Sequence, residues 1–415
     1  MEYTHIFVGT DTGLLKGVNI TSKSFTNIAT DEHGLVNKER AIDALFFEPS
    51  SQAALADSST SSSTSTAASS PSKIRLCLRN RDVVRLDMKD PSQYFSRVIV
   101  DGGDGKFVGG GIVDTLTVTC VESGEICGNE GLQKSKIICT AGQNVTKMVQ
   151  SEPNFPIFAT GGRENHLKIW DVLNPKQPIF TAKNLSDDKL RLRVPNWIKD
   201  ISFRPKTDSK IVLTATAYGQ VHVYDTRANR RPVMFVNFWV DDKSKDAMPL
   251  TSLDLNPQNE FEFIASNTHG NVRLFDVRGT KGLVRKAFTG NAGTVKQISF
   301  HPTVAGHFAT CGMDRILRFY EVTQKEPISE IYMKSQPTCF LFTDEVVRAW
   351  QPEQEVVLPE EKKRVKRRKP TLNLDDNVPE SDSVWTEMSA LTEDDLEDEP
   401  ELQLVSLSKK KRVKT

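Results

Sequence analysis

Cysteine, histidine and glycine are the residue types whose spacing in this sequence could support chemistry. The six cysteines include no Cys-x-x-Cys pair and have no two-histidine set beside them, so we expect no metal site. The N-terminus lacks a signal-peptide pattern, which favours the cytosol or nucleus, where disulfides are rare. We therefore expect ordinary apolar strand residues at Cys77, Cys120, Cys127, Cys139, Cys311 and Cys339.

Signatures of catalysis are missing as well. The glycines of residues 102–111 suggest a phosphate loop, but Gly105-Lys106 is followed by Phe107 rather than Ser or Thr. We interpret this stretch as a flexible loop. The sequence has no Gly-x-Ser-x-Gly and no His-Glu-x-x-His, and its seven histidines are scattered. The prediction is a protein that is not an enzyme and needs no cofactor.

Charge is segregated along the chain, although 54 basic and 54 acidic residues give a formal net charge of zero. Basic blocks at 361–370 and 408–415 flank an acidic stretch at 375–401. Such blocks indicate nuclear import or contacts with RNA phosphates. From these features we predict a disordered tail over residues 349–415 and a nuclear protein. The cations concerned are Lys362, Lys363, Arg364, Lys366, Arg367, Arg368, Lys369, Lys409, Lys410, Lys411 and Arg412.

An internal repeat decides the fold class. Four segments, at 158–171, 214–225, 264–276 and 308–321, each read as a strand, a tight turn and a second strand that ends in an aromatic residue and an acid. The segments recur about every fifty residues, which is typical of four-stranded propeller blades. Three of them are preceded by an alternating strand that stops at proline: KDISFRP at 199–205, TSLDLNP at 251–257 and KQISFHP at 296–302.

The first half of the chain has weaker strand signals, at 5–20, 41–47, 74–88, 111–127 and 145–158. Together they predict an all-β, seven-bladed WD-repeat β-propeller over residues 1–348. We expect the strand at 339–345 to pair with the N-terminal strands and close the ring, because an open propeller would expose two edges. Residues 50–72 are rich in Ser, Thr and Ala, which predicts a disordered insertion. No apolar run is long enough to span a membrane.

Several longer strings are selective enough to indicate a family. FVGTDTGLLKGVN (7–19), GGRENHLKIWD (161–171), the RVPNW loop (193–197), CGMDRILR (311–318) and YMKSQ (332–336) are not required of a generic repeat. With these strings the chain resembles the nucleolar WD-repeat factors of large ribosomal subunit assembly, the Nop-seven-associated or WD-repeat-seventy-four family. The resemblance covers the propeller from end to end, whereas the tail matches only in being polar and basic.

The resemblance implies a non-catalytic scaffold of nucleolar precursors of the large ribosomal subunit. Such a factor contacts other assembly factors and ribosomal RNA, works as a monomer within a large complex, and is removed by an AAA-type ATPase. The alternatives are a nuclear WD-repeat adaptor of a chromatin or ubiquitin-ligase complex, and an enzyme that uses the propeller channel.

Candidate partner contacts are polar or aromatic residues that the fold does not require. A strand turn and the long connection at 186–197 supply most of them, and arginine and tryptophan are favoured at interfaces. Turn capping by Asn165 and blade packing by Trp197 are the competing explanations. The predicted contacts are Arg163, Glu164, Asn165, Arg191, Arg193, Trp197, Lys334 and Gln336.

Overall fold

The computed structural model describes residues 5–28, 37–48, 73–87, 94–131, 135–151, 155–187, 190–205, 209–237, 248–278 and 283–343. They all belong to the first of two units, Met1–Gln354, and the second unit, Glu355–Thr415, lies wholly outside the described residues. The Ser-rich segment 50–72 and both basic blocks also lie outside them, so the roles and the disorder predicted for these segments stay predictions.

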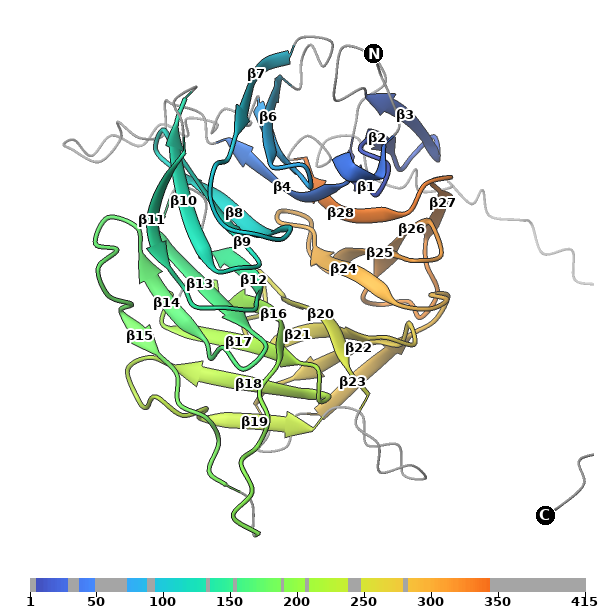
Figure 1. Ribbon diagram of the computed structural model, residues 1–415. Coiled ribbons are helices and arrows are strands. Elements are labelled where there is room, and N and C mark those ends of the chain that lie inside the picture. The colour runs from blue at the N-terminus through green and yellow to red at the C-terminus, as the bar shows by residue number, and fades with distance from the viewer. Residues whose placement is uncertain are drawn as a thin grey trace, which may run out of the picture. The chain divides into compact units, whose positions relative to one another are not determined.

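Seven four-stranded antiparallel sheets are arranged as blades around a ring (Figure 1). We number them as blades 1 to 7. Blade 1 contains β28 (Pro337–Phe342), β1 (Ile6–Thr10), β2 (Leu15–Asn19) and β3 (Ser24–Ile28); a short 3-10 helix η1 (Lys38–Arg40) leads into blade 2, which contains β4 (Ile42–Glu48), β5 (Lys73–Leu78), β6 (Asp82–Asp87) and β7 (Tyr94–Ile99). Blade 3 contains β8 (Phe107–Val113), β9 (Leu116–Val121), β10 (Glu125–Glu130) and β11 (Lys136–Thr140).

The remaining blades follow the chain in the same way. Blade 4 contains β12 (Val145–Gln150), β13 (Ile157–Gly162), β14 (Lys168–Asp171) and β15 (Phe180–Thr181), and blade 5 contains β16 (Ile198–Phe203), β17 (Ile211–Thr216), β18 (Gln220–Asp225) and β19 (Met234–Asn237). Blade 6 contains β20 (Leu250–Leu255), β21 (Glu262–Asn267), β22 (Val272–Asp276) and β23 (Leu283–Phe288), and blade 7 contains β24 (Val295–Phe300), β25 (His307–Gly312), β26 (Ile316–Glu321) and β27 (Ser329–Tyr332). The predicted seven-bladed propeller is confirmed.

The ring closes inside blade 1. Strand β28, from the end of the propeller sequence, pairs antiparallel with β1, so that Val8 lies opposite Phe340. This confirms the predicted closure, although the strand begins at Pro337, two residues earlier than expected. The innermost strands β28, β4, β8, β12, β16, β20 and β24 contact one another in ring order, and β28 contacts both β24 and β4.

The hydrophobic core is divided into seven clusters, each lying between two neighbouring blades. Between blades 6 and 7, for example, the rings of Phe308 and Tyr320 stack with their centroids 5.0 Å apart, and both side chains are fully buried. Alternation explains this arrangement, because successive side chains of a strand point to opposite faces and each face meets a different neighbour. The aromatic-acid pairs end the third strand of their blades, at Asp171, Asp225, Asp276 and Glu321.

One expectation is wrong. The glycine-rich stretch was predicted to be a loop, but its second part forms β8, the innermost strand of blade 3. The reason is close packing, because a Cβ on Gly109 would lie 2.0 Å from the carbonyl oxygen of Met148 in β12. Glycine is required here by the approach of two backbones and not by flexibility.

The cysteine prediction is confirmed. All six cysteines lie in strands and are free, and five of them are buried. Burial raises the pKa of the Cys139 thiol to about 11 and that of Cys339 to about 12. These thiols therefore stay protonated near neutral pH and are poor nucleophiles.

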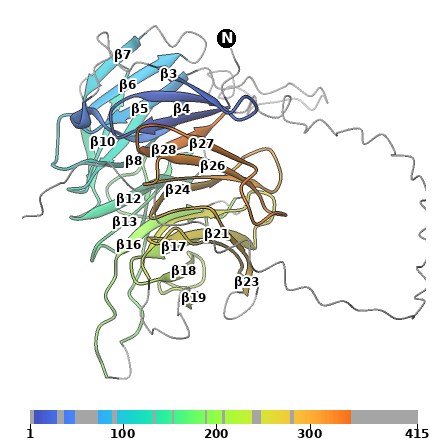
Figure 2. The same cartoon turned by 90° about the vertical axis from the view of Figure 1, so that its right-hand side faces the viewer.

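We call the face on which each innermost strand begins the top face. It carries the connections between blades and the turns that join the second and third strands of each blade. The connection between β15 and β16 projects beyond the ring in two perpendicular views (Figures 1 and 2).

Candidate binding surface on the top face

Two segments of the top face bring most of the predicted contacts together. The β13–β14 turn and the end of the β15–β16 connection are joined by an isolated β-bridge between Arg163 and Trp197. The Glu164 N–H donates to the carbonyl oxygen of Asn196 at 2.8 Å, and the Asn196 N–H donates to Glu164 Oε1 at 3.1 Å. The long connection is therefore anchored to the turn by backbone and side-chain bonds at its C-terminal end.

An ion pair adds to this anchor. Arg193 donates to Glu164 Oε2 at 2.7 Å, with side chains that are 61% and 48% exposed. At that exposure the pair contributes at most about 1 kcal/mol to stability. The ion pair mainly fixes where these charges lie, because it places one cation and one anion side by side on the surface.

Trp197 is the centre of the cationic part of this surface. The Arg163 guanidinium carbon lies 5.0 Å from the centroid of its ring and Lys199 Nζ lies 3.9 Å from it. Both distances fall within the range of cation–π attraction. The indole N–H is buried but has no acceptor among the described residues, whereas the indole of Trp170 donates to Thr160 Oγ1 at 2.9 Å. Trp197 is therefore held by its ring and its backbone, not by its polar atom.

Two further predicted contacts of this region, Asn165 and Arg191, differ in exposure. Asn165 is buried, and its amide donates to the carbonyl oxygens of Ala141 and Gln143 at 3.2 and 3.0 Å. Its side chain thus ties the β13–β14 turn to the preceding connection. Arg191 is exposed in the projecting connection and has a positive φ of 58°.

The other two predicted contacts lie apart. Lys334 and Gln336 belong to the connection from β27 to β28, which is also on the top face but is separated from Trp197 by blades 5, 6 and 7. Lys334 is exposed with a φ of 63°, and the carbonyl oxygen of Gln336 accepts the N–H of Asp11 at 3.0 Å. The eight predicted residues therefore share one face but do not form one patch.

A ring of residues that sequence reasoning missed surrounds the channel on this face. Near its start, every innermost strand has a register shift that leaves one residue unpaired, as in a β-bulge. The unpaired residues are Thr338, Asp43, Val108, Thr146, Lys199, Thr251 and Lys296. A signal for them was present, because Lys199, Thr251 and Lys296 are the first residues of the three proline-ended motifs.

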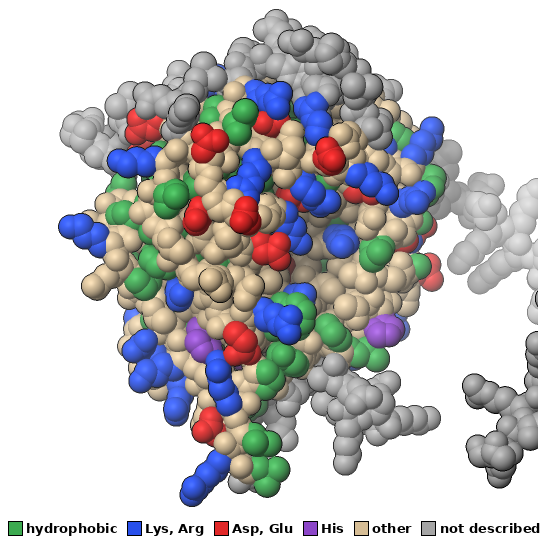
Figure 3. Space-filling model, viewed as in Figure 1, with side chains coloured by type: hydrophobic (Ala, Val, Ile, Leu, Met, Phe, Trp, Pro, Cys, Tyr) green, Lys and Arg blue, Asp and Glu red, His purple; other side chains and the backbone are tan. Residues whose placement is uncertain are grey.

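Lys199 of this ring is influenced by other cations of the same face. The pKa of Lys199 is lowered by burial first and then by Lys106, Lys296 and Arg163. An anion bound among these cations would relieve their mutual repulsion. Figure 3 shows Lys and Arg side chains around the hollowed middle of the ring, with a few acidic side chains among them.

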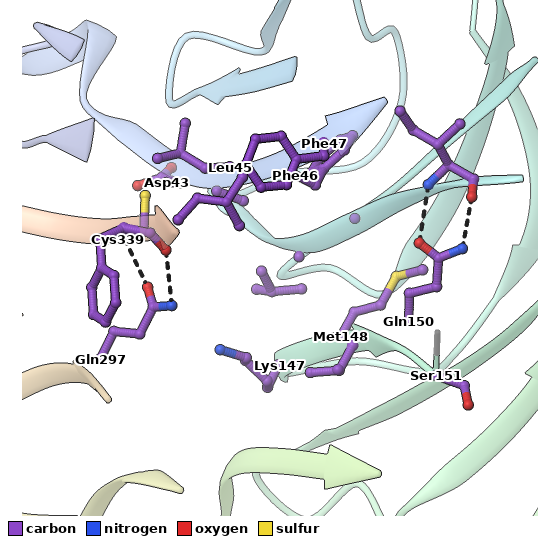
Figure 4. Close-up of a pocket in the computed structure, with 18 residues that line it drawn as sticks. Asp43, Leu45, Phe46, Phe47, Lys147, Met148, Gln150, Ser151, Gln297 and Cys339 are labelled. Carbon is purple, nitrogen blue, oxygen red and sulfur yellow. Dashed lines mark hydrogen bonds between the residues drawn. The ribbon is translucent and has the colours of Figure 1, made fainter. Parts of the chain in front are cut away.

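Inside the channel, side chains link the blades. A cavity of about 390 Å³ is lined by blades 1 to 4 and by Gln297 of blade 7, with Gln297 and Gln150 at opposite sides (Figure 4). Each glutamine amide bonds both backbone groups of a residue in the next blade, Phe340 and Ile112 respectively. Lys147 Nζ lies 3.2 Å from Asp200 Oδ1, and this carboxylate is the main cause of the raised pKa of Lys147.

Among the described residues, no group of three or more His, Cys, Asp or Glu side chains could hold a metal ion. Within the same residues, no helix has the length and apolar character needed to cross a membrane.

Taken together, seven blades with WD-like repeats and a polar top face make this chain a WD-repeat β-propeller. No protein-family model matches it. It is 32% identical over 349 residues to WD repeat-containing protein 74 of Bos taurus, with 82% of each chain covered, and 30% identical over 396 residues to the protein of that name in Homo sapiens, with 94% of this chain and 90% of the relative covered. The chain belongs to the family of WD repeat-containing protein 74.

A further relative is fungal. Over 243 residues, covering 51% of this chain and 58% of the relative, the sequence is 30% identical to ribosome biogenesis protein NSA1 of Meyerozyma guilliermondii. A similar match, 28% identical over 227 residues, is found with ribosome biogenesis protein nsa1 of Schizosaccharomyces pombe.

Proposed function

We propose that this protein is a ribosome biogenesis factor that acts as a non-catalytic scaffold on precursors of the large ribosomal subunit. The observation that carries the proposal is its kinship with WD repeat-containing protein 74 along most of the propeller, together with its similarity to relatives named for ribosome biogenesis. The narrower assignment, to nucleolar large-subunit precursors, follows from the family resemblance of the sequence motifs.

The mechanism is docking by a rigid surface. The blades hold Arg163, Arg193 and Trp197 in fixed positions through the β-bridge and the ion pair with Glu164, so little ordering entropy is lost on binding. Assembly factors contact this surface, and the basic blocks of the tail add salt-dependent affinity for ribosomal RNA. The same blocks direct nuclear import, and an AAA-type ATPase removes the protein from the particle.

Sedimentation of nuclear extract from cells that express the tagged full chain tests the proposal. We expect the protein to co-migrate with precursor ribosomal RNA of the large subunit, and to leave those fractions at high salt or after RNase treatment. Migration as a small complex without precursor RNA would overturn the ribosomal assignment and leave a nuclear adaptor of a chromatin or ubiquitin-ligase complex as the better account.

A triple variant tests the surface within the same experiment. R163A/R193A/W197A removes two arginines and an aromatic side chain from the docking surface, and we expect it to weaken particle association. The matched control R227A/R231A/Y332A removes the same kinds of side chain from other parts of the propeller surface. Equal association of the two variants would exclude this surface as the docking site.

A further inference from the structure

A cavity of about 470 Å³ opens beside Trp197 on the top face. It lies where the innermost strands β16, β20 and β24 of blades 5, 6 and 7 begin. Trp197, Lys199 and Tyr218 line one part of it, and Pro249, Val295 and Lys296 line another. A cavity of this volume holds a few side chains of a bound chain, because ligand pockets start at about 300 Å³.

The charged groups of this cavity have one sign. Lys199 and Lys296 line it, and none of the described residues that line it is acidic. Within the described part of the chain, neither ammonium group has a carboxylate within ion-pair distance. Both lysines are the unpaired residues of their strands, which places them at the mouth of the channel. The cavity is therefore complementary to an anion.

The remaining wall combines apolar and aromatic side chains with three threonines, Thr251, Thr268 and Thr294. Pro249 is half-buried and presents hydrocarbon, and Tyr218 is 38% exposed although its ring is large. An exposed aromatic beside apolar atoms favours a ligand that has an apolar part as well as its charge. Free phosphate or an isolated RNA phosphate would leave this wall uncovered.

Nucleic acid fits the cavity less well than a peptide does. Single strands bind through bases that stack on open aromatic rings along a charged groove. The Trp197 ring is already in contact with Lys199 and Arg163, so Tyr218 alone offers an open ring and successive bases have no row of rings to stack on. A concave site with a few polar groups on an apolar wall is instead typical of sites that accept side chains.

We infer that this cavity binds an acidic peptide segment of a partner protein. A glutamate or aspartate carboxylate lies between Lys199 and Lys296, and a neighbouring apolar side chain packs against Pro249 and Tyr218. The inference extends the proposed function by naming the chemistry of one protein contact. It does not require that the partner be a ribosome assembly factor.

Fluorescence anisotropy with the purified full chain tests this. The probe is a short labelled peptide of Gly-Glu-Leu-Glu repeats, and its comparison peptide has Gln at each Glu. We expect the Gln peptide to bind at least about tenfold more weakly, because it loses charge-assisted bonds to both lysines. K199M/K296M, which keeps most of the apolar stem of each lysine, should weaken the Glu peptide to a similar extent.

The matched control is K136M/K325M, which removes two exposed lysines outside the cavity. It should leave the affinity within about twofold, and thermal unfolding of both variants establishes that they fold. Equal binding of the Glu and Gln peptides, or equal loss in the control variant, would overturn the inference. So would an oligouridylate that displaces the peptide and itself loses affinity in K199M/K296M, because the cavity would then be a nucleic-acid site. The proposed ribosomal role is tested separately by sedimentation.

Discussion

Two arcs of the ring hold neighbouring blades together by different means. In blades 5 to 7, which we call the carboxylate arc, acidic side chains of one innermost strand accept backbone N–H groups of the next. Asp200 Oδ2 accepts from Ser252 Oγ and from the N–H of Leu253, both at 2.9 Å. Asp254 Oδ2 accepts from the N–H of Phe300 at 2.8 Å, and its Oδ1 accepts from Ser202 Oγ at 3.4 Å. Asp254 thus joins three blades.

In blades 2 to 4, the glycine arc, glycines of the innermost strand β8 lie where a side chain would meet the neighbouring blades. A Cβ on Gly110 would lie 3.0 Å from the Phe46 ring of blade 2, and one on Gly111 would lie 2.2 Å from Gln150 Oε1 of blade 4. Here the missing side chains let backbones and aromatic rings pack together. The same blade-to-blade geometry is therefore reached either by hydrogen bonding or by removing side-chain volume.

The comparison explains where the repeat can be recognised. Hydrogen-bonded junctions need particular residues at fixed places in the strand, so the carboxylate arc keeps the motifs at 199–205, 251–257 and 296–302. A junction made by close packing needs only small residues, so the glycine arc lost the motif but kept the fold.

Adding a methyl group at Gly109 in the glycine arc should cause the largest loss of stability. G109A places a methyl group against the Met148 carbonyl oxygen, so the backbones must move apart, and we expect a loss of about 3 kcal/mol in the free energy of unfolding. Urea denaturation measures it. G306A is the matched control, because its Cβ would meet nothing closer than 4.0 Å and only its φ of 67° is unfavourable, at about 1 kcal/mol. Equal losses would contradict close packing as the reason for Gly109.

Removing the acid that joins the three blades of the carboxylate arc, Asp254, should cause the second largest loss of stability. D254N replaces an acceptor oxygen by a donor that faces N–H groups, and we expect a loss of about 1–3 kcal/mol at neutral pH. Denaturation of D254N beside the unmodified protein measures this.

The same variant has a pH signature. Burial raises the pKa of Asp254 to about 6, above the ordinary value of 3.8, so the folded protein binds this proton more tightly than the unfolded chain does. The stabilising contribution of the protonated carboxyl is complete below pH 3.8 and is lost as the pH rises through about 6. The difference in free energy of unfolding between the unmodified protein and D254N should therefore become smaller from pH 4 to pH 6. A difference that grows would mean that the hydrogen bonds to the carboxylate lower the pKa of Asp254 by more than burial raises it.

Each arc also contains a glutamine that links two neighbouring blades. Gln150 and Gln297 each bond the N–H and the carbonyl oxygen of one residue in a neighbouring blade. We expect Q150A and Q297A each to lose about 1–3 kcal/mol, because each leaves two backbone groups without partners. Hydrogen exchange should show faster exchange at Ile112 in the first variant and at Phe340 in the second. Exchange that spreads equally over the ring in both would argue against local junctions.

The smallest change in stability is expected for a substitution on the top face. W197F removes an indole N–H that has no acceptor among the described residues, so stability should change by less than about 0.5 kcal/mol. W170F removes a bonded indole and should lose about 1–2 kcal/mol. Thermal unfolding compares them. If W197F lost more stability than W170F, Trp197 would be needed for packing, and substitutions of it could not separate binding from folding.

The sequence could predict those parts of the molecule that depend on local pattern. Alternation, turns and the aromatic-acid pairs were sufficient for the blade count and for the pairing of β28 with β1. They were insufficient for β8, because the need for Gly109 comes from Met148, which lies in the next blade. Of the candidate surface, Arg163, Arg193 and Trp197 were chosen from the sequence because the fold does not require these residue types at their positions. Lys199 and Lys296 were missed because they stand inside the repeat, and only the bulge turns them toward the channel mouth.

Closure of the ring inside blade 1 has a consequence in time. A ribosome adds about 5–20 residues per second, so roughly 15 to 65 s separate the synthesis of β1 from that of β28. Until β28 emerges, β1 lacks the neighbour that covers its inner edge, and an uncovered strand is a template for aggregation. The nascent chain therefore passes through a stage in which up to six blades are complete while the first still waits for its last strand. We therefore expect the growing polypeptide, more than the finished molecule, to expose a strand edge on which other chains can pair.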